Sequence, residues 1–158
     1  MTLPIKIKRL SPGAKIPTKA NPTDAGWDLY LPEGKRFWFD SKLRKTVDLN
    51  ISIAIPEGWY MKIEPRSGLA VNDGVHILAG VIDCSYRGSL KVCVLNTGNH
   101  GFSLSGGSRI AQATLHRVPD VQWIEVDELD QTERGAGGFG SSGVCFTLSG
   151  HISVWQHF

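Results

Sequence analysis

Hydrophobic and polar residues alternate along much of the chain with a period of two. In the clearest run, the aliphatic residues at every second position are Val47, Leu49, Ile51, Ile53 and Ile55. Residues 59–64 and 90–94 repeat this pattern. Successive side chains of a strand point to opposite faces, so such alternation indicates a strand with one buried face. We therefore predict strands in all three stretches.

Shorter segments of similar character give further strand candidates, at Ile5–Leu10, Gly26–Tyr30, Val75–Leu78, Arg109–Leu115 and Gln122–Val126. Clusters of glycine, proline, asparagine and aspartate separate them, which is typical of turns. Helical periodicity is almost absent, and only Ser67–Val71 is predicted to form about one turn of helix. Many short strands separated by turns predict one all-β domain, either a sandwich, a jelly roll or a barrel.

Composition narrows the functional classes. A chain of 158 residues suits one domain with its own core, and a net charge of +2 lacks the basic bias of a general nucleic-acid binder. The three cysteines (Cys84, Cys93 and Cys145) form no CxxC pair, which fits a reducing compartment. We see no secretory signal and no membrane-spanning run. We therefore expect an intracellular protein, in the cytoplasm with the nucleus left open, and neither a membrane nor a nucleic acid as partner.

A glycine-rich stretch near the C-terminus, RGAGGFGSSG (residues 134–143), contains a literal GxGxxG. In a dinucleotide site that pattern stands between a strand and a helix of a βαβ unit. Here no βαβ pattern precedes it, and only Ser141–Phe158 follow. The glycines therefore need an explanation other than a nicotinamide cofactor.

Five short motifs follow one another along the chain: DAGWDLY (24–30), PRSGLA (65–70), GVIDCSYRG (80–88), GSRIAQ (107–112) and RGAGGFGSSG (134–143). In this order and spacing they resemble the five motifs of the trimeric dUTPases, over about Ile5–Gly143. The resemblance implies a jelly-roll or distorted-barrel domain over residues 1–143. It also implies a homotrimer whose three active sites are each assembled from all three subunits.

The resemblance further implies Mg²⁺-dependent hydrolysis of dUTP to dUMP and pyrophosphate, by attack of water on the α-phosphorus. Asp83 would orient and activate that water, because a positioned carboxylate assists a weak nucleophile. Asp28 would support the site near the metal, and Ser67 would complete the catalytic set. Outside the motifs, Asp83 would be read as a turn residue and Asp28 as a carboxylate at a strand edge.

The substrate-binding residues implied by the resemblance are Arg66, Ser67, Gly68, Ala79, Val81, Ile82, Asp83, Tyr86, Lys91, Gln112, Arg134, Phe139, Gly140 and Ser141. Residues 66–68 and Gln112 would meet phosphate oxygens. The backbone of residues 79–83 would read uracil, and the ring of Tyr86 would exclude a 2′-hydroxyl. Arg109 is expected to be structural.

The last motif would be a mobile lid. Arg134 would pair with the γ-phosphate, Phe139 would stack on uracil, and Gly140 and Ser141 would donate to the γ-phosphate. The alternative is a flexible Gly/Ser linker. The resemblance implies Mg²⁺ held mainly by the triphosphate and water, so we expect no metal ligand from the protein.

Three features depart from the motif pattern. Ser85 stands where many family members have a second aspartate. The basic and aromatic run Lys35–Lys45 is expected on an outer hairpin, as a solvated strand edge or as a partner-binding patch. The extension Val144–Phe158 is too apolar for a disordered tail, and our hypothesis is that it packs on the trimer as added β structure.

Two alternatives to a dUTPase remain. The dCTP deaminases resemble the second and third motifs, but carry a catalytic glutamate three residues before the asparagine that ends the following strand. In this chain that position is Cys93, three residues before Asn96, and deaminases lack the glycine-rich lid. The other alternative is a trimeric scaffold that binds a regulatory protein.

Overall fold

The computed structural model describes residues 2–138 and residue 141. It divides into two units, Met1–Asp120 and the residues from Val121 onward, and each is described by itself. Phe139, Gly140 and the extension Val144–Phe158 lie outside the described residues. The packing of the extension therefore stays a prediction.

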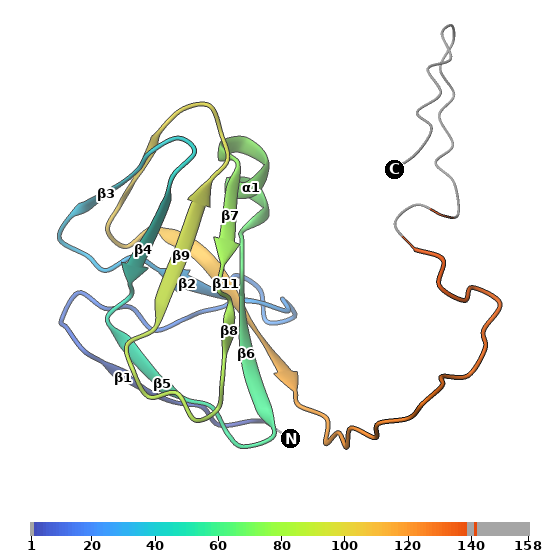
Figure 1. The fold of residues 1–158 in the computed structure, drawn as a ribbon. Coiled ribbons are helices and arrows are strands. Elements are labelled where there is room, and N and C mark those ends of the chain that lie inside the picture. Colours follow the sequence, from blue (N-terminus) through green and yellow to red (C-terminus); the bar gives the residue numbers. More distant parts are fainter. Residues whose placement is uncertain (1, 139–140, 142–158) are drawn as a thin grey trace, which may run out of the picture. The chain divides into compact units, whose positions relative to one another are not determined.

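The first unit is built of short strands and one helix (Figure 1). In chain order the elements are β1 (Lys6–Arg9), β2 (Trp27–Tyr30), β3 (Arg36–Phe39), β4 (Arg44–Asp48), β5 (Ile51–Ala54), β6 (Trp59–Glu64), α1 (Ser67–Asp73), β7 (Val75–Leu78), β8 (Val81–Ile82), β9 (Lys91–Asn96), β10 (Phe102–Ser105) and β11 (Arg109–Arg117). The helix includes the predicted turn at 67–71 and continues two residues further.

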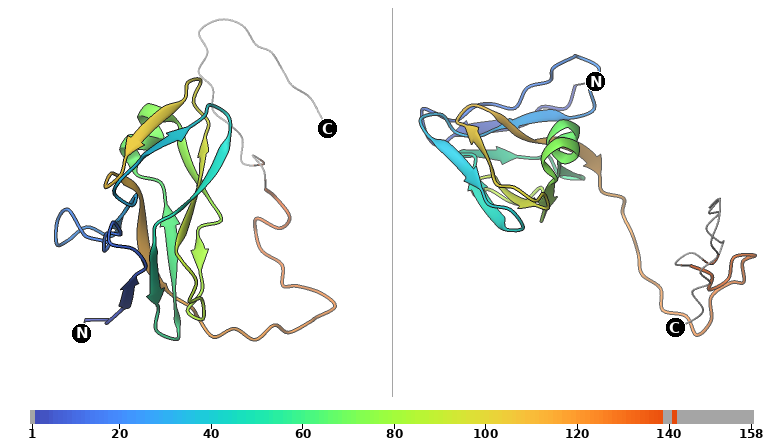
Figure 2. Two further views of the ribbon diagram at one scale, coloured as in Figure 1. Left: turned by 90° about the vertical axis from the view of Figure 1, so that its left-hand side faces the viewer. Right: turned by 90° about the horizontal axis from the view of Figure 1, so that it is seen from above.

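The strands pair antiparallel in four small sheets. Two sheets have two strands, β1-β5 and β10-β3; one has three, β4-β9-β7; and one has four, β2-β11-β6-β8. These sheets wrap around a common interior, and α1 packs beside β7 at one end (Figure 2). The all-β architecture is the one predicted from the turn-separated strands, and the distorted barrel of jelly-roll type is the one implied by the resemblance of the five motifs.

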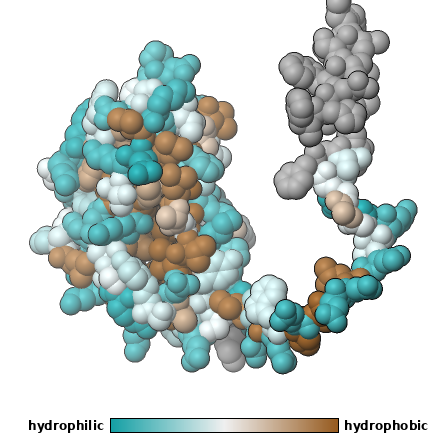
Figure 3. Space-filling view, in the orientation of Figure 1, coloured by the Kyte–Doolittle hydropathy of each residue, from teal (hydrophilic) through white to brown (hydrophobic). Residues whose placement is uncertain are grey.

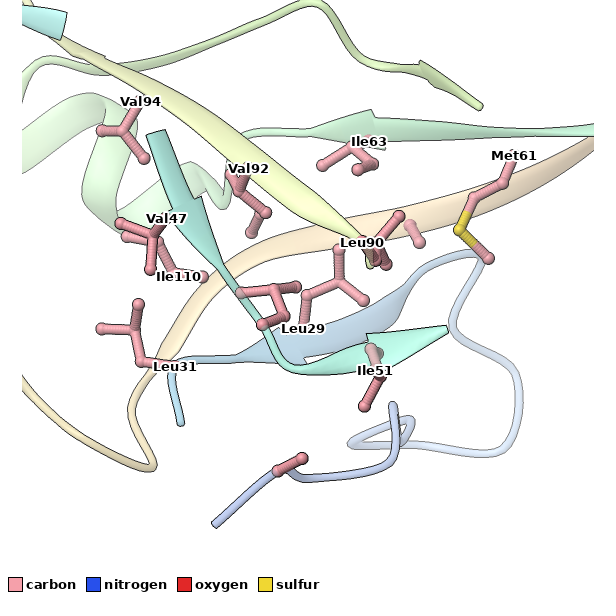
Figure 4. Packing of buried hydrophobic residues seen from close by; sticks show 14 of the residues in the cluster. Leu29, Leu31, Val47, Ile51, Met61, Ile63, Leu90, Val92, Val94 and Ile110 are labelled. Carbon is pink, nitrogen blue, oxygen red and sulfur yellow. The ribbon is translucent and has the colours of Figure 1, made fainter. Parts of the chain in front are cut away.

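The alternating aliphatic residues fill that interior. All five predicted inward residues of the run from Val47 to Ile55 are buried, and so are Leu90, Val92 and Val94. Side chains from different sheets, among them Leu29 of β2 and Val92 of β9, gather in the same interior (Figure 4). Burial of these side chains on one face of each strand is the main stabilising contribution to the fold.

The longest alternating run is two strands rather than one. Asn50, between β4 and β5, has φ of 56°, in the left-handed region. Its backbone N–H donates to the Asp48 carboxylate at 2.7 Å. Asparagine tolerates this conformation better than most residues, so the chain changes sheet there while its aliphatic side chains stay inward.

The predicted strand Gln122–Val126 is wrong. These residues form no strand, and Trp123 and Ile124 are 92% and 74% exposed. Apolar and hydrophilic side chains mix along this stretch (Figure 3). A strand needs a neighbour for its backbone hydrogen bonds. Among the described residues, no strand pairs with this segment.

The predicted outer hairpin over Lys35–Lys45 is also wrong. Its two strands belong to different sheets, because β3 pairs with β10 and β4 with β9. Phe37 and Phe39 are buried, while Trp38 is exposed and donates its indole N–H to Asp40 at 2.7 Å. The buried phenylalanines tie β3 to the core, which a hairpin at the periphery does not require.

Candidate active site

One cavity gathers the first, second and fourth motifs; we call it the Arg66 cavity. It has a volume of about 290 Å³ and is lined by Ala20, Asp24, Ala25, Gly26, Asp28, Arg66, Ser67 and Gln112. The three motifs meet because β11 lies between β2 and β6. In that sheet Gln112 stands opposite both Asp28 and Glu64.

Asp28 is the electrostatic centre of the Arg66 cavity. Its buried carboxylate accepts from Arg66 Nε at 2.8 Å and from Arg109 Nη1 at 3.1 Å. Such charge-assisted bonds fix the direction of a guanidinium. Because the bond from Arg66 uses Nε, its terminal NH₂ groups remain as donors. Arg109, expected to be structural, holds the other oxygen of the same carboxylate.

Gln112 is positioned by a neighbouring glycine. Its amide NH₂ donates to the backbone carbonyl of Pro65 at 3.0 Å. A Cβ atom at Gly26 would lie 2.6 Å from the amide oxygen of Gln112, which is too close for an ordinary contact. A glycine is therefore needed at position 26 for Gln112 to occupy this place.

Ser67 and Gly68 form the first turn of α1. Arg66 precedes the helix with an extended backbone, and no side-chain cap bonds to the first turn. The first N–H groups of a helix have no partner within it. A Cβ atom at Gly68 would meet nothing within 4 Å. This turn therefore offers backbone donors next to open space.

A second cavity, the hairpin cavity, lies beside the third motif. Its volume is about 360 Å³ and it is lined by Thr46, Ala79, Val81, Ile82, Asp83, Tyr86, Lys91 and Cys93. A volume of a few hundred Å³ is typical of small-molecule sites. Six of the substrate-binding residues implied by the resemblance line this one cavity.

The turn between β7 and β8 shapes one wall of the hairpin cavity. Ala79 has φ of 51°, a left-handed conformation that costs a residue other than glycine about 1–2 kcal/mol. At Gly80 a Cβ atom would lie 2.4 Å from the carbonyl oxygen of Ile63. The Ile63 N–H donates to the Gly80 carbonyl at 2.7 Å. The wall is thus backbone held tightly against β6.

Tyr86 and Asp83 lie at the exposed side of this wall. Tyr86 is 41% exposed, which is unlike a core tyrosine. Its hydroxyl donates to the Ser89 carbonyl at 2.9 Å, and a Cβ atom at Gly88 would lie 2.5 Å from that hydroxyl. Asp83 is exposed, and its backbone carbonyl accepts from the Tyr86 N–H at 3.2 Å. The carboxylate of Asp83 is therefore accessible from the cavity.

Two lining residues, Thr46 and Cys93, were not among the site residues expected from the sequence. They belong to none of the five motifs, and they face each other across β4 and β9. A signal was present, because Cys93 lies two residues after Lys91 and so shares its strand face. The cavity has a thiol at position 93, where the deaminase alternative requires a glutamate.

The second unit holds the described part of the fifth motif. The Arg134 guanidinium donates through Nε to the Gly137 carbonyl at 2.8 Å. Gly135 has φ of 50°, and the Ser141 N–H donates to the Gly138 carbonyl at 3.0 Å. These residues form successive turns. Phe139 and Gly140 lie outside the described residues, so their predicted contacts stay predictions.

In the described part of the chain, both a clustered metal site and a membrane-spanning helix are absent. No group of three His, Cys, Asp or Glu side chains there is arranged to hold a metal ion. Nor does that part contain a helix of the length and apolarity needed to cross a membrane. Cys84 and Cys93 are both free thiols.

Comparisons with known proteins agree on one family. The sequence model of the dUTPase family matches residues 13–143. A deoxyuridine 5'-triphosphate nucleotidohydrolase of Yarrowia lipolytica is 45% identical over 142 residues, or 89% of each chain. A mutant dUTPase of Staphylococcus bacteriophage 80alpha, solved with dUpNHpp, superposes with a TM-score of 0.82 at 25% identity. It covers 90% of this chain and all of its own.

A more distant structure shares the fold. A mutant dUTPase of phage phi11 of S. aureus, studied for its coordination of a structural Mg(II) ion, has a TM-score of 0.72 at 20% identity. It covers 79% of this chain and 97% of its own. The profile match spans most of the chain and includes both cavities and the glycine-rich motif. The chain therefore belongs to the dUTPase family.

Proposed function

We propose that this protein hydrolyses dUTP to dUMP and pyrophosphate, by attack of water on the α-phosphorus. The observation that carries the proposal is the hairpin cavity, where an accessible carboxylate, Asp83, lines the same wall as Tyr86. Asp83 orients the attacking water and accepts its proton. The reaction removes dUTP before it can place uracil in DNA, and supplies dUMP for thymidylate synthesis.

The hairpin cavity holds the deoxyuridine. The backbone of residues 79–83 pairs with the edge of uracil, and a base with other donors leaves backbone groups unpaired. The ring of Tyr86 packs against the sugar and leaves no room for a 2′-hydroxyl. The fixed backbone at Ala79 and Gly80 supports this role, because recognition by shape requires a wall that does not yield.

The Arg66 cavity holds phosphates. The NH₂ groups of Arg66, the Ser67 hydroxyl, the Gly68 N–H and the Gln112 amide all donate toward negative charge. The pairing of Arg66 with Asp28 supports this role, because a donor held in place needs no reorganisation during the reaction. From the second unit, Arg134, Gly140 and Ser141 bind the γ-phosphate and Phe139 covers the base.

Mg²⁺ accompanies the triphosphate. It neutralises phosphate charge, and a Mg²⁺ site of this kind uses substrate oxygens and water with few protein ligands. The donor set fits this arrangement, since both oxygens of Asp28 are bonded to arginines. Chelation of divalent ions with EDTA should therefore abolish turnover, and added Mg²⁺ should restore it. Full turnover in EDTA would contradict the metal requirement.

We also propose that the enzyme is a homotrimer and acts inside the cell. The two cavities support shared sites, because motifs proposed to act on one nucleotide line different hollows of one chain. The exposed apolar side chains after β11 support a covering partner. Analytical ultracentrifugation should give the mass of three chains, and a monomer at micromolar concentration would contradict this part of the proposal.

Nucleotide turnover tests the proposed function. The protein is incubated with dUTP, dCTP, dTTP and UTP in the presence of Mg²⁺, and pyrophosphate and ammonia are measured. Pyrophosphate from dUTP alone is expected. Ammonia from dCTP would support a deaminase. The absence of any turnover would overturn the proposal in favour of a scaffold that binds a regulatory protein.

A further inference from the structure

We propose that Cys93 is a base-contacting residue: with Thr46 it forms the floor of the hairpin cavity, and the size of the side chain at position 93 limits the space for the pyrimidine. This inference rests on the proposed function. It concerns two residues that lie outside all five motifs.

Cys93 lies on the outward face of the central strand of a sheet. In β4-β9-β7 it stands opposite Thr46 on β4 and opposite Leu78 on β7. Its neighbours Val92 and Val94 are fully buried, so they point into the core. Because side chains alternate along a strand, Cys93 points away from the core and toward the cavity it lines.

The hairpin wall rises from the edge of this floor. Leu78, opposite Cys93, is followed directly by Ala79, the first residue of the wall. The cavity therefore has a floor formed by side chains of the sheet and a wall formed by backbone, and the two have different roles. The backbone of the wall offers hydrogen bonds to the edge of a base, whereas the floor offers a surface to its face.

The chemistry of the floor suits the face of a flat ring. A cysteine behaves as a small apolar residue with a polarizable sulfur, and a threonine carries a methyl group beside its hydroxyl. The Cys93 thiol is only a weak hydrogen-bond donor, so it leaves the edge of the base to the backbone of the wall. A branched side chain at position 93 would occupy space in a cavity of only about 360 Å³ and would lift the base out of register with the wall.

Substitution at position 93 gives the first test. Cys93→Leu should raise KM for dUTP roughly tenfold or more, about 1.4 kcal/mol, while kcat stays within about threefold. Cys93→Ser, of similar size, should keep KM within about threefold. Leu95→Phe is the matched control, since it adds bulk two residues along the same face but outside the cavity lining. Unchanged KM in Cys93→Leu would overturn the inference.

Protection of the thiol gives a second test that needs no variant. Trypsin places Cys84, Cys93 and Cys145 on three separate peptides, so mass spectrometry follows each thiol independently. Saturating dUpNHpp should slow the alkylation of Cys93 by iodoacetamide at least about fivefold. Cys84, which packs against the core cluster, is the internal reference.

The outcomes separate this inference from the proposed function. If dUTP is hydrolysed but Cys93 reacts equally fast with and without dUpNHpp, the proposed contact between Cys93 and the base is overturned and the proposed function stands. A Cys93 that fails to react in the free protein would also contradict a thiol facing an open cavity. If dUTP is not hydrolysed at all, the proposed function is overturned, and so is the role of Cys93 as a base-contacting residue.

Discussion

The two cavities are held in different ways. The Arg66 cavity is arranged by side chains, with one buried carboxylate, Asp28, between two guanidinium groups. The hairpin cavity is arranged by backbone, with Ala79 in a left-handed conformation and Gly80 in close contact with β6. Charge has to be aimed at a phosphate, whereas a base is selected by shape. Ion pairs therefore determine the geometry of the Arg66 cavity, and steric contacts of the backbone determine that of the hairpin cavity.

The largest effect is expected at Asp83, the one acidic group among the described residues that line the hairpin cavity. Asp83→Asn keeps the shape of the side chain but removes its ability to accept a proton. Catalysis by a positioned base contributes about 10²–10⁴-fold, so kcat should fall by that factor. The Kd for dUpNHpp, measured by calorimetry, should be nearly unchanged. Glu57→Gln, at another exposed acidic residue, is the control, and equal kcat in both variants would remove Asp83 from the mechanism.

Asp28→Asn should have the next largest effect on activity. Hydrogen bonds to charged groups are worth about 1.5–3 kcal/mol, so kcat/KM for dUTP should fall roughly 10- to 100-fold. Arg66 and Arg109 would lose their shared anion and repel each other. Glu64→Gln is the control because it breaks the Lys62–Glu64 pair in the same sheet, in which Lys62 is exposed and Glu64 half-buried, and pairs open to solvent contribute little. If both variants behave alike, the Arg66 cavity is not set by its ion pairs.

Gly80→Ala tests whether close packing of the backbone determines the shape of the hairpin cavity. The added Cβ atom would meet a backbone carbonyl, which cannot swing aside, and overpacking of this kind costs about 1–3 kcal/mol. Both the melting temperature and the affinity for dUpNHpp should fall. Gly68→Ala, where the added atom meets open space, should not lower the melting temperature. An unchanged melting temperature and an unchanged affinity for dUpNHpp in Gly80→Ala would show that the backbone at this wall can move to accept the added atom.

The smallest effect is expected for Gly26→Ala. Here the added Cβ atom would meet the end of the flexible Gln112 side chain rather than backbone. Gln112 should rotate away, leaving the melting temperature unchanged and raising KM for dUTP about two- to tenfold. Thermal melts and steady-state kinetics on the same preparation distinguish this from Gly80→Ala. A large loss of stability would mean that Gln112 is held as rigidly as the backbone wall.

Much of the fold was predictable because the local pattern of apolar residues indicates which face of each strand is buried. The aliphatic positions from Val47 to Ile55 were assigned correctly, although the chain turns at Asn50 between two sheets. The strand at Gln122–Val126 was wrong although the segment holds tryptophan, isoleucine and valine, which are common in strands. Alternation reports which face could be buried, and says nothing about whether a neighbouring strand is present.

The candidate site was predictable wherever residues belong to a contiguous motif. Asp83 and Tyr86 stand three residues apart in the chain, and they line one cavity. Thr46 and Cys93 were missed because they are 47 positions apart and meet only through the pairing of β4 with β9. No local pattern distinguishes such a pair from other outward-facing strand residues.

The family, the all-β class and the inward faces of the strands could all be inferred from the order of residues along the chain. These depend on short motifs and on a period of two, and both are local properties. The meeting of three motifs around β11 and the place of Cys93 in the lining of the hairpin cavity became clear only from the folded chain. Strand pairing joins residues far apart in the chain. Its outcome depends on how all the buried faces pack together, which no single segment specifies.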